Sequence, residues 1–141
     1  MTAPPWLGST VEYEGFPLAL RVRPQAGSAS NRTQLPHLVA ITHHLDHVRS
    51  DGLPEAAYNE GLAPFDADVI ECLERYGKGL VALVETFAGR RTYYAYATAL
   101  DLGTGAIVEL QERYPGYRVT ESHTANEGWE LFAHYKSLFP W

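Results

Sequence analysis

Gly79-Leu-Val-Ala-Leu-Val-Glu-Thr-Phe87 and Arg90-Arg-Thr-Tyr-Tyr-Ala-Tyr-Ala-Thr98, joined by Ala88-Gly89, form the stretch that decides the fold. The first run is apolar at almost every position, which is typical of a central strand covered on both faces. The second run is rich in tyrosine, and the glycine between the two favours a tight turn. The sequence therefore predicts a long central hairpin over residues 79–98.

A helix and a strand are predicted on each side of this hairpin. The helices extend from near Glu55 to Tyr76, with a break at Gly61, and over residues 102–114. The strands lie outside them, over residues 37–43 and 117–122. The order strand, helix, strand, strand, helix, strand is that of a ferredoxin-like, split βαβ core, in which helices cover one face of an antiparallel sheet.

Three further segments complete the predicted α+β domain, which spans residues 1–141. Strands near 10–13 and 17–23 flank a glycine turn and predict an N-terminal β-hairpin. Residues 24–36 are rich in polar side chains and glycine, so we expect an exposed loop there. Apolar residues at helical spacing predict a C-terminal helix over residues 128–138.

Composition restricts the function and the location. Seventeen acidic against eleven basic residues give a net charge of −6, and dispersed basic residues argue against nucleic-acid binding. An acidic surface is compatible with a basic protein partner. One cysteine excludes an internal disulfide, and the N-terminus lacks the pattern of a secretory signal, so we expect a cytoplasmic protein. We expect no membrane association, because no apolar run approaches the roughly 20 residues of a membrane span.

A cluster of histidines and aspartates offers the clearest metal-binding pattern. His43, His44, Asp46, His47 and Asp51 are residue types that zinc or another transition metal accepts as ligands. If the strand continues through the first two histidines, alternation sends them to opposite faces, so a common ion requires a turn there. The alternative is that these are ordinary polar histidines. Beyond such an ion, the sequence predicts no cofactor.

Two buried reactive groups are also predicted. Glu85 interrupts the apolar central strand, where burial raises the pKa of a carboxyl and suits it to proton transfer. Pairing with Arg90, Arg91 or a tyrosine hydroxyl is the alternative. Cys72 lies on the apolar face of its helix, which favours packing over nucleophilic chemistry.

Aromatic residues are concentrated at the C-terminus. Trp129, Tyr135 and Trp141 are candidate contacts for a protein partner, because exposed aromatic side chains often anchor interfaces. The alternative is that they cover the core, with their polar atoms at its surface.

Three short motifs in this order are similar to those of a known family. They are Ser50-Asp-Gly-Leu-Pro54, Gly89-Arg-Arg-Thr-Tyr-Tyr-Ala-Tyr96, and Trp129 followed by Tyr135, Leu138 and Pro140. The chain resembles, over about residues 11–140, the bacterial family catalogued as domain of unknown function 695. That family is in turn similar to the acidic B-type protein inhibitors of ribonuclease E. The matching positions are Asp51, Gly52, Trp129 and Tyr135, and the resemblance assigns no catalytic role to them.

This resemblance implies a protein-binding regulator that acts through an acidic or aromatic surface. A homodimer formed by edge pairing of the N-terminal hairpin is a further possibility, because an open strand edge is a template for association. The alternative function is a metal-binding protein or metal-dependent enzyme centred on residues 43–47.

Overall fold

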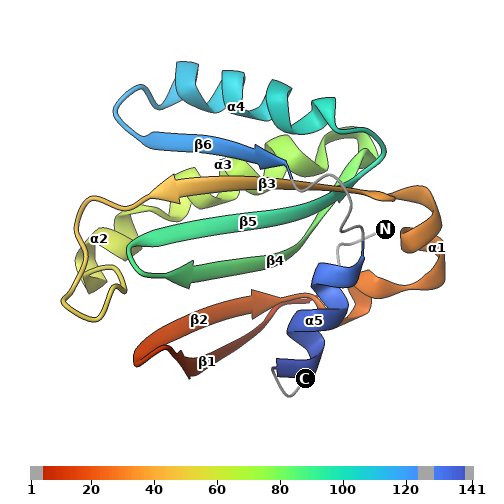
Figure 1. The fold of residues 1–141 in the computed structure, drawn as a ribbon. Coiled ribbons are helices and arrows are strands. Elements are labelled where there is room, and N and C mark those ends of the chain that lie inside the picture. Colours follow the sequence, from red (N-terminus) through yellow and green to blue (C-terminus); the bar gives the residue numbers. More distant parts are fainter. Residues whose placement is uncertain (1–4, 124–128, 139–141) are drawn as a thin grey trace.

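The computed structural model describes residues 5–123 and 129–138, which form one antiparallel sheet flanked by helices (Figure 1). The sheet order is β1-β2-β4-β5-β3-β6, and every neighbouring pair is antiparallel. The strands are β1 (Leu7–Tyr13), β2 (Phe16–Val22), β3 (His37–His44), β4 (Gly79–Phe87), β5 (Arg90–Ala97) and β6 (Arg118–His123).

The helices confirm the predicted ferredoxin-like α+β arrangement. They are η1 (Pro24–Gly27), α1 (Ala29–Gln34), α2 (Ala56–Gly61), α3 (Ala63–Glu74), η2 (Arg75–Gly77), α4 (Asp101–Arg113) and α5 (Glu130–Leu138). The order β3-α3-β4-β5-α4-β6 is the split βαβ motif, and α3 and α4 lie on the same side of the sheet (Figure 1). Of the helices that the structure describes, none combines the length and apolar composition needed to span a bilayer.

The sheet separates two hydrophobic cores. The larger core lies under α3 and α4, where Phe65, Val69 and Leu110 pack on Val39 and Tyr93. The smaller core lies on the other face and joins side chains of β2, β3, β4 and β5 to η1 and α5. Burial on both faces explains why the sequence of β4 is apolar at nearly every position.

A β-bulge at Ala82 interrupts the pairing of β4 with β5. Arg23, 4% exposed, donates to the carbonyl oxygen of Val81 at 3.0 Å and forms an ion pair with Glu74. Glu74 also accepts from the Val81 amide at 2.9 Å. These side chains therefore satisfy backbone groups that an irregular ladder leaves without strand partners.

The predicted N-terminal hairpin is present and extends the sheet at one edge. Glu14 and Gly15 form its two-residue turn, with φ values of 52° and 85°. Two successive positive φ values define a type I′ turn, whose twist matches that of the flanking strands. β2 then pairs with β4, which leaves β1 at the edge of the sheet.

Residues 24–36 are the clearest departure from the predicted structure. The expected exposed loop contains η1 and α1, and Ala26 and Leu35 are buried in the smaller core. Ser28 caps α1 by accepting from the Asn31 amide at 3.2 Å. A six-residue helix is too short to produce a readable hydrophobic period, which explains the wrong prediction.

Candidate functional site

His43 is a core residue. Its side chain is 1% exposed, and its ring centroid lies 4.7 Å from that of Phe65 and 5.3 Å from that of Tyr117. Neither ring nitrogen has a hydrogen-bond partner in the described part of the chain. Burial, followed by the nearby charge of Arg91, lowers the pKa of His43 to about 4. The imidazole is therefore neutral at pH 7 and packs as an aromatic ring.

The other residues of the predicted metal segment do not form a cluster of ligand atoms with His43 among the described residues. They have partners elsewhere: His44 with Thr120, Asp46 with Arg118, His47 with Tyr58, and Asp51 with Arg49. The segment gives no group of three ligand atoms within 4.8 Å of one another among the described residues. The metal site stays a prediction, and the placement of these side chains does not favour it.

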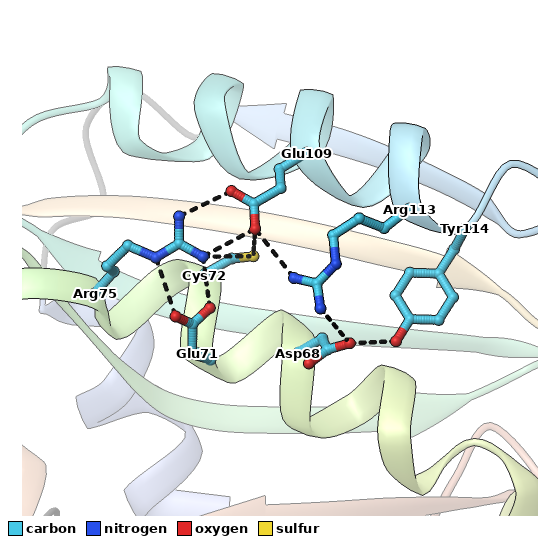
Figure 2. Close-up of polar contacts among 7 residues, drawn as sticks. All are labelled: Asp68, Glu71, Cys72, Arg75, Glu109, Arg113 and Tyr114. Atoms are coloured by element: carbon cyan, nitrogen blue, oxygen red, sulfur yellow. Dashed lines mark hydrogen bonds and ion pairs between the residues drawn. The ribbon is translucent and has the colours of Figure 1, made fainter.

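A group that does meet this distance lies between α3 and α4, and comprises Glu71, Cys72 and Glu109. Figure 2 shows Arg75 reaching across both carboxylates. Its Nη2 is 2.7 Å from Glu71 Oε2, and its Nη1 is 2.8 Å from Glu109 Oε1. Because an arginine already pairs with both carboxylates, a cation would have to compete with it.

The same network joins the two helices further along their length. Arg113 donates to Glu109 at 3.1 Å and to Asp68 at 3.0 Å, and Tyr114 also donates to Asp68 (Figure 2). Burial, and then the hydrogen bond to Glu109, raises the pKa of Cys72 to about 12. The thiol therefore stays protonated, and its 5% exposure confirms the predicted burial.

Trp129 and Tyr135 attach α5 to the sheet. The Trp129 ring stacks on Tyr96 with 3.6 Å between centroids, and its Nε1 donates to the Leu35 carbonyl at 2.9 Å. Tyr135 is 9% exposed and belongs to the smaller core. Trp141 lies outside the described residues. The partner-binding role of these aromatics stays a prediction, and the two described rings pack on the molecule's own core.

Glu85 begins a polar row across the sheet face that α5 leaves open. Glu85 on β4 pairs with Thr92 on β5. Thr92 pairs with Thr42 on β3, and Thr42 pairs with Thr120 on β6. Burial raises the pKa of Glu85, and the Tyr135 hydroxyl donates to its carboxylate. The row lies in a polar pocket of about 320 Å³. Of the predicted residues, His44 and Glu85 meet in this pocket.

A larger groove of about 590 Å³ lies between the N-terminal hairpin and helices α2 and α3. Arg21 on β2 donates twice to Asp66 on α3, at 3.1 and 2.6 Å. The Tyr93 hydroxyl donates to the same carboxylate at 2.6 Å. Asp66 is thus held by two elements that lie far apart in the sequence.

Arg91 also lines this groove. Its Nε donates to Thr86 Oγ1 at 2.9 Å, and its Nη2 donates to Asn59 Oδ1 at 2.8 Å. Neither arginine was predicted from the sequence to line a groove, and Arg91, which was considered as a partner of Glu85, instead contacts Thr86 and Asn59. A usable signal was the alternation of Arg21 with apolar residues in β2, because a charge on one face of a strand requires a polar environment there.

The edge strand β1 exposes apolar side chains. Leu7 is 50% exposed and Tyr13 is 49% exposed, and Phe16 at the start of β2 is 49% exposed. Leu7, Val11 and Tyr13 alternate on the face that carries α5. An exposed apolar row beside an unpaired strand edge is a feature of interaction surfaces.

Comparison with protein families identifies the family of this chain. The model of the family of unknown function DUF695 matches residues 6–136. The chain belongs to this family. No curated protein and no solved structure gives a match. The similarity of DUF695 to ribonuclease E inhibitors therefore stays a resemblance.

Proposed function

We propose that this DUF695 protein is a protein-binding regulator that associates through the open edge of β1, and that its partner is a second copy of the chain. The observation that carries the proposal is a seven-residue edge strand without proline, lysine or bulge. Natural sheets commonly protect their edges with such features. The role is compatible with the cytoplasmic location expected from the sequence.

The groups with catalytic potential favour binding over chemistry. Cys72 donates to Glu109, and Glu85 accepts from Tyr135. His43 is packed between aromatic rings. Each of these groups is engaged inside the fold, which supports a role for the surface.

The hairpin turn determines which backbone groups of β1 point outward. A two-residue turn closes on a hydrogen-bonded pair, here Tyr13 and Phe16. Alternate residues along β1 then face away from β2, so the N–H and C=O groups of Gly8, Thr10 and Glu12 point to the open edge. These three residues can form a ladder with an added strand.

A second copy matches this edge when Thr10 lies on the twofold axis. Antiparallel pairing then places Gly8 opposite Glu12 of the second copy, and Leu7 opposite Tyr13. The two exposed apolar side chains cover each other, and all three outward-facing residues are paired. This register uses the whole length of β1.

Charge complementarity supports the same register. Gly8 pairs with Arg21 within the chain, and in this register it also pairs with Glu12 of the second copy. Because glycine has no side chain, nothing separates the side chains of these two residues. Their Cα atoms are roughly 10 Å apart, two strand spacings, which long side chains can bridge. The main charged residue of one edge therefore approaches Arg21 of the other copy, a cation that also pairs with Asp66 in its own chain.

Sedimentation equilibrium tests the proposal with two substitutions at one position. Thr10→Pro removes an outward-facing N–H, which an edge strand tolerates, and should give a folded monomer. Thr10→Val keeps the N–H and the strand propensity, and should associate like the wild type. The wild type should be dimeric.

A wild-type chain that is monomeric up to about 1 mM would reject the proposal, since even an association of about −4 kcal/mol is substantial there. A Thr10→Pro variant that remains dimeric would place the interface elsewhere. The first result would leave a different protein as the partner to be sought, whereas the second would keep the second copy and move the interface.

A further inference from the structure

Arg91 is distinguished by the partners of its guanidinium. Several arginines of the described structure donate hydrogen bonds to other side chains. Except for Arg91, each of these donates to a carboxylate: Arg21, Arg23, Arg49, Arg75, Arg113 and Arg118. Arg91 donates to the neutral oxygens of Thr86 and Asn59. Its positive charge is therefore not balanced by a direct ion pair among the described residues.

This charge lies in the groove of about 590 Å³ between the N-terminal hairpin and helices α2 and α3. The charged residues that line the groove are Arg21, Asp66 and Arg91. The first two neutralise each other through their two hydrogen bonds, which leaves one positive charge in a chain whose net charge is −6. A volume of about 590 Å³ is within the range of small-molecule sites.

The guanidinium is also held in a defined orientation. Arg91 is half-buried on the central strand β5, and its Thr86 partner on β4 is 5% exposed. Two hydrogen bonds fix Nε and Nη2, and Nη1 has no hydrogen-bond partner among the described residues. An arginine that is already ordered loses less entropy when it binds a ligand.

We propose that this groove binds a small anionic metabolite whose carboxylate or phosphate group contacts Arg91. Guanidinium groups match the geometry of these two anions and form strong, charge-assisted hydrogen bonds with them. Thr10 also lines the groove and offers a hydroxyl donor. The charge of Arg91 also acts at a distance. After burial, it is the second cause of the lowered pKa of His43.

The ligand is a small anion rather than a nucleic acid. One unpaired cation suits a single anionic group, whereas a polyanion requires a row of basic residues. The inference does not rest on the association through β1, because the groove is complete within one chain.

The test is a titration of the isotope-labelled full chain, followed by two-dimensional amide NMR, with inorganic phosphate and separately with succinate. Chloride keeps the ionic strength constant. At least one anion should give saturable shifts around Arg91 and Asn59, with a Kd of about 1 mM or tighter. Phosphate alone would identify a phosphorylated ligand, and succinate alone a carboxylate.

Two variants remove the unbalanced charge in different ways. Arg91→Gln deletes it, whereas Asn59→Asp places a carboxylate where an amide oxygen now lies 2.8 Å from Nη2. Both should weaken binding at least about tenfold, since a hydrogen bond to a charged group contributes about 1.5–3 kcal/mol. Asn59 is exposed, so the second variant should fold even if the first does not.

The matched control is Arg113→Gln, which removes an arginine from the α3–α4 network and should leave the affinity unchanged. The absence of saturable shifts at about 10 mM of either anion would overturn the proposal. Equal binding by wild type, Arg91→Gln and Asn59→Asp would overturn it too, because the anion would then bind elsewhere.

Discussion

The two faces of the sheet are covered in different ways. On one side, α3 and α4 bury a large core together with polar groups, of which Arg23 is 4% and His43 is 1% exposed. On the other side, α5 attaches through aromatic rings: Phe132 is 1% exposed, and Trp129 stacks on Tyr96. The core under α3 and α4 thus includes buried polar groups, whereas α5 is attached by a few large aromatic side chains.

The difference follows from helix length. A nine-residue helix such as α5 is not stable alone in water, so its attachment depends on a few large side chains. The pair α3 and α4 buries more apolar area, which can offset the cost of desolvating polar groups. Substitutions on each face can therefore separate these two kinds of attachment.

The largest effect is expected for Phe132→Ala on α5. The change deletes a fully buried ring whose centroid lies 5.6 Å from that of Trp129, and it leaves a cavity. We expect the free energy of unfolding to fall by about 4 kcal/mol, measured by urea denaturation. His134→Ala on the exposed side of α5 is the control and should change it by less than about 0.5 kcal/mol. A loss below about 1 kcal/mol for Phe132→Ala would contradict this view of α5.

A smaller loss is expected for Glu74→Gln under the other face. It leaves the guanidinium of Arg23, whose side chain is 5% exposed, without its carboxylate. Removal of one partner from a buried ion pair should cost about 3 kcal/mol, again measured by urea denaturation.

Glu109→Gln is the matched control for this ion pair. The arginines that Glu109 contacts, Arg75 and Arg113, have side chains that are 34% and 45% exposed. Exposed pairs contribute little, so we expect a loss of at most about 1 kcal/mol. Equal losses for Glu74→Gln and Glu109→Gln would remove the distinction between buried and exposed charges.

The smallest effect concerns His43 and depends on pH. The pKa of His43 is about 4 in the folded chain, against 6.5 for an ordinary histidine, so the unfolded chain takes up a proton first as the pH falls. The stabilisation is complete above pH 6.5 and is lost as the pH falls towards about 4. By about pH 5 the loss should be on the order of 2 kcal/mol.

His43→Phe should remove this part of the pH dependence, because a phenyl ring packs in the same site without titrating. The measurement is the free energy of unfolding of both chains between pH 7 and about pH 4. His134→Phe controls for the loss of one histidine. Identical pH profiles for His43→Phe and wild type would show that His43 is not the titrating group.

Most of the fold could be predicted because its signals are local. The apolar run of β4 and the helical spacing of Phe65, Val69 and Cys72 identified a strand and a helix before any contact was known. The order of such elements then restricted the topology to the split βαβ arrangement. The prediction of an exposed loop over residues 24–36 was wrong because the helices there are short and bury few side chains.

The candidate sites could be predicted only in part. Glu85 was recognised as a charge in an apolar strand, but its tyrosine partner lies on α5, fifty residues away, rather than on a neighbouring strand. The metal site was predicted because the histidines and aspartates of this segment are close in sequence. Strand alternation instead sends His43 to the core and His44 to the opposite face.

The sequence by itself determined the elements, their order, the apolar faces and the net charge, because each depends on residue types at short spacing. The tertiary structure alone decided which charges are paired. Arg21 donates to Asp66, which lies 45 positions away in the sequence, whereas Arg91 donates only to neutral side chains. Strand register, sheet order and helix docking bring such groups together, and these depend on how the whole chain packs rather than on any local pattern.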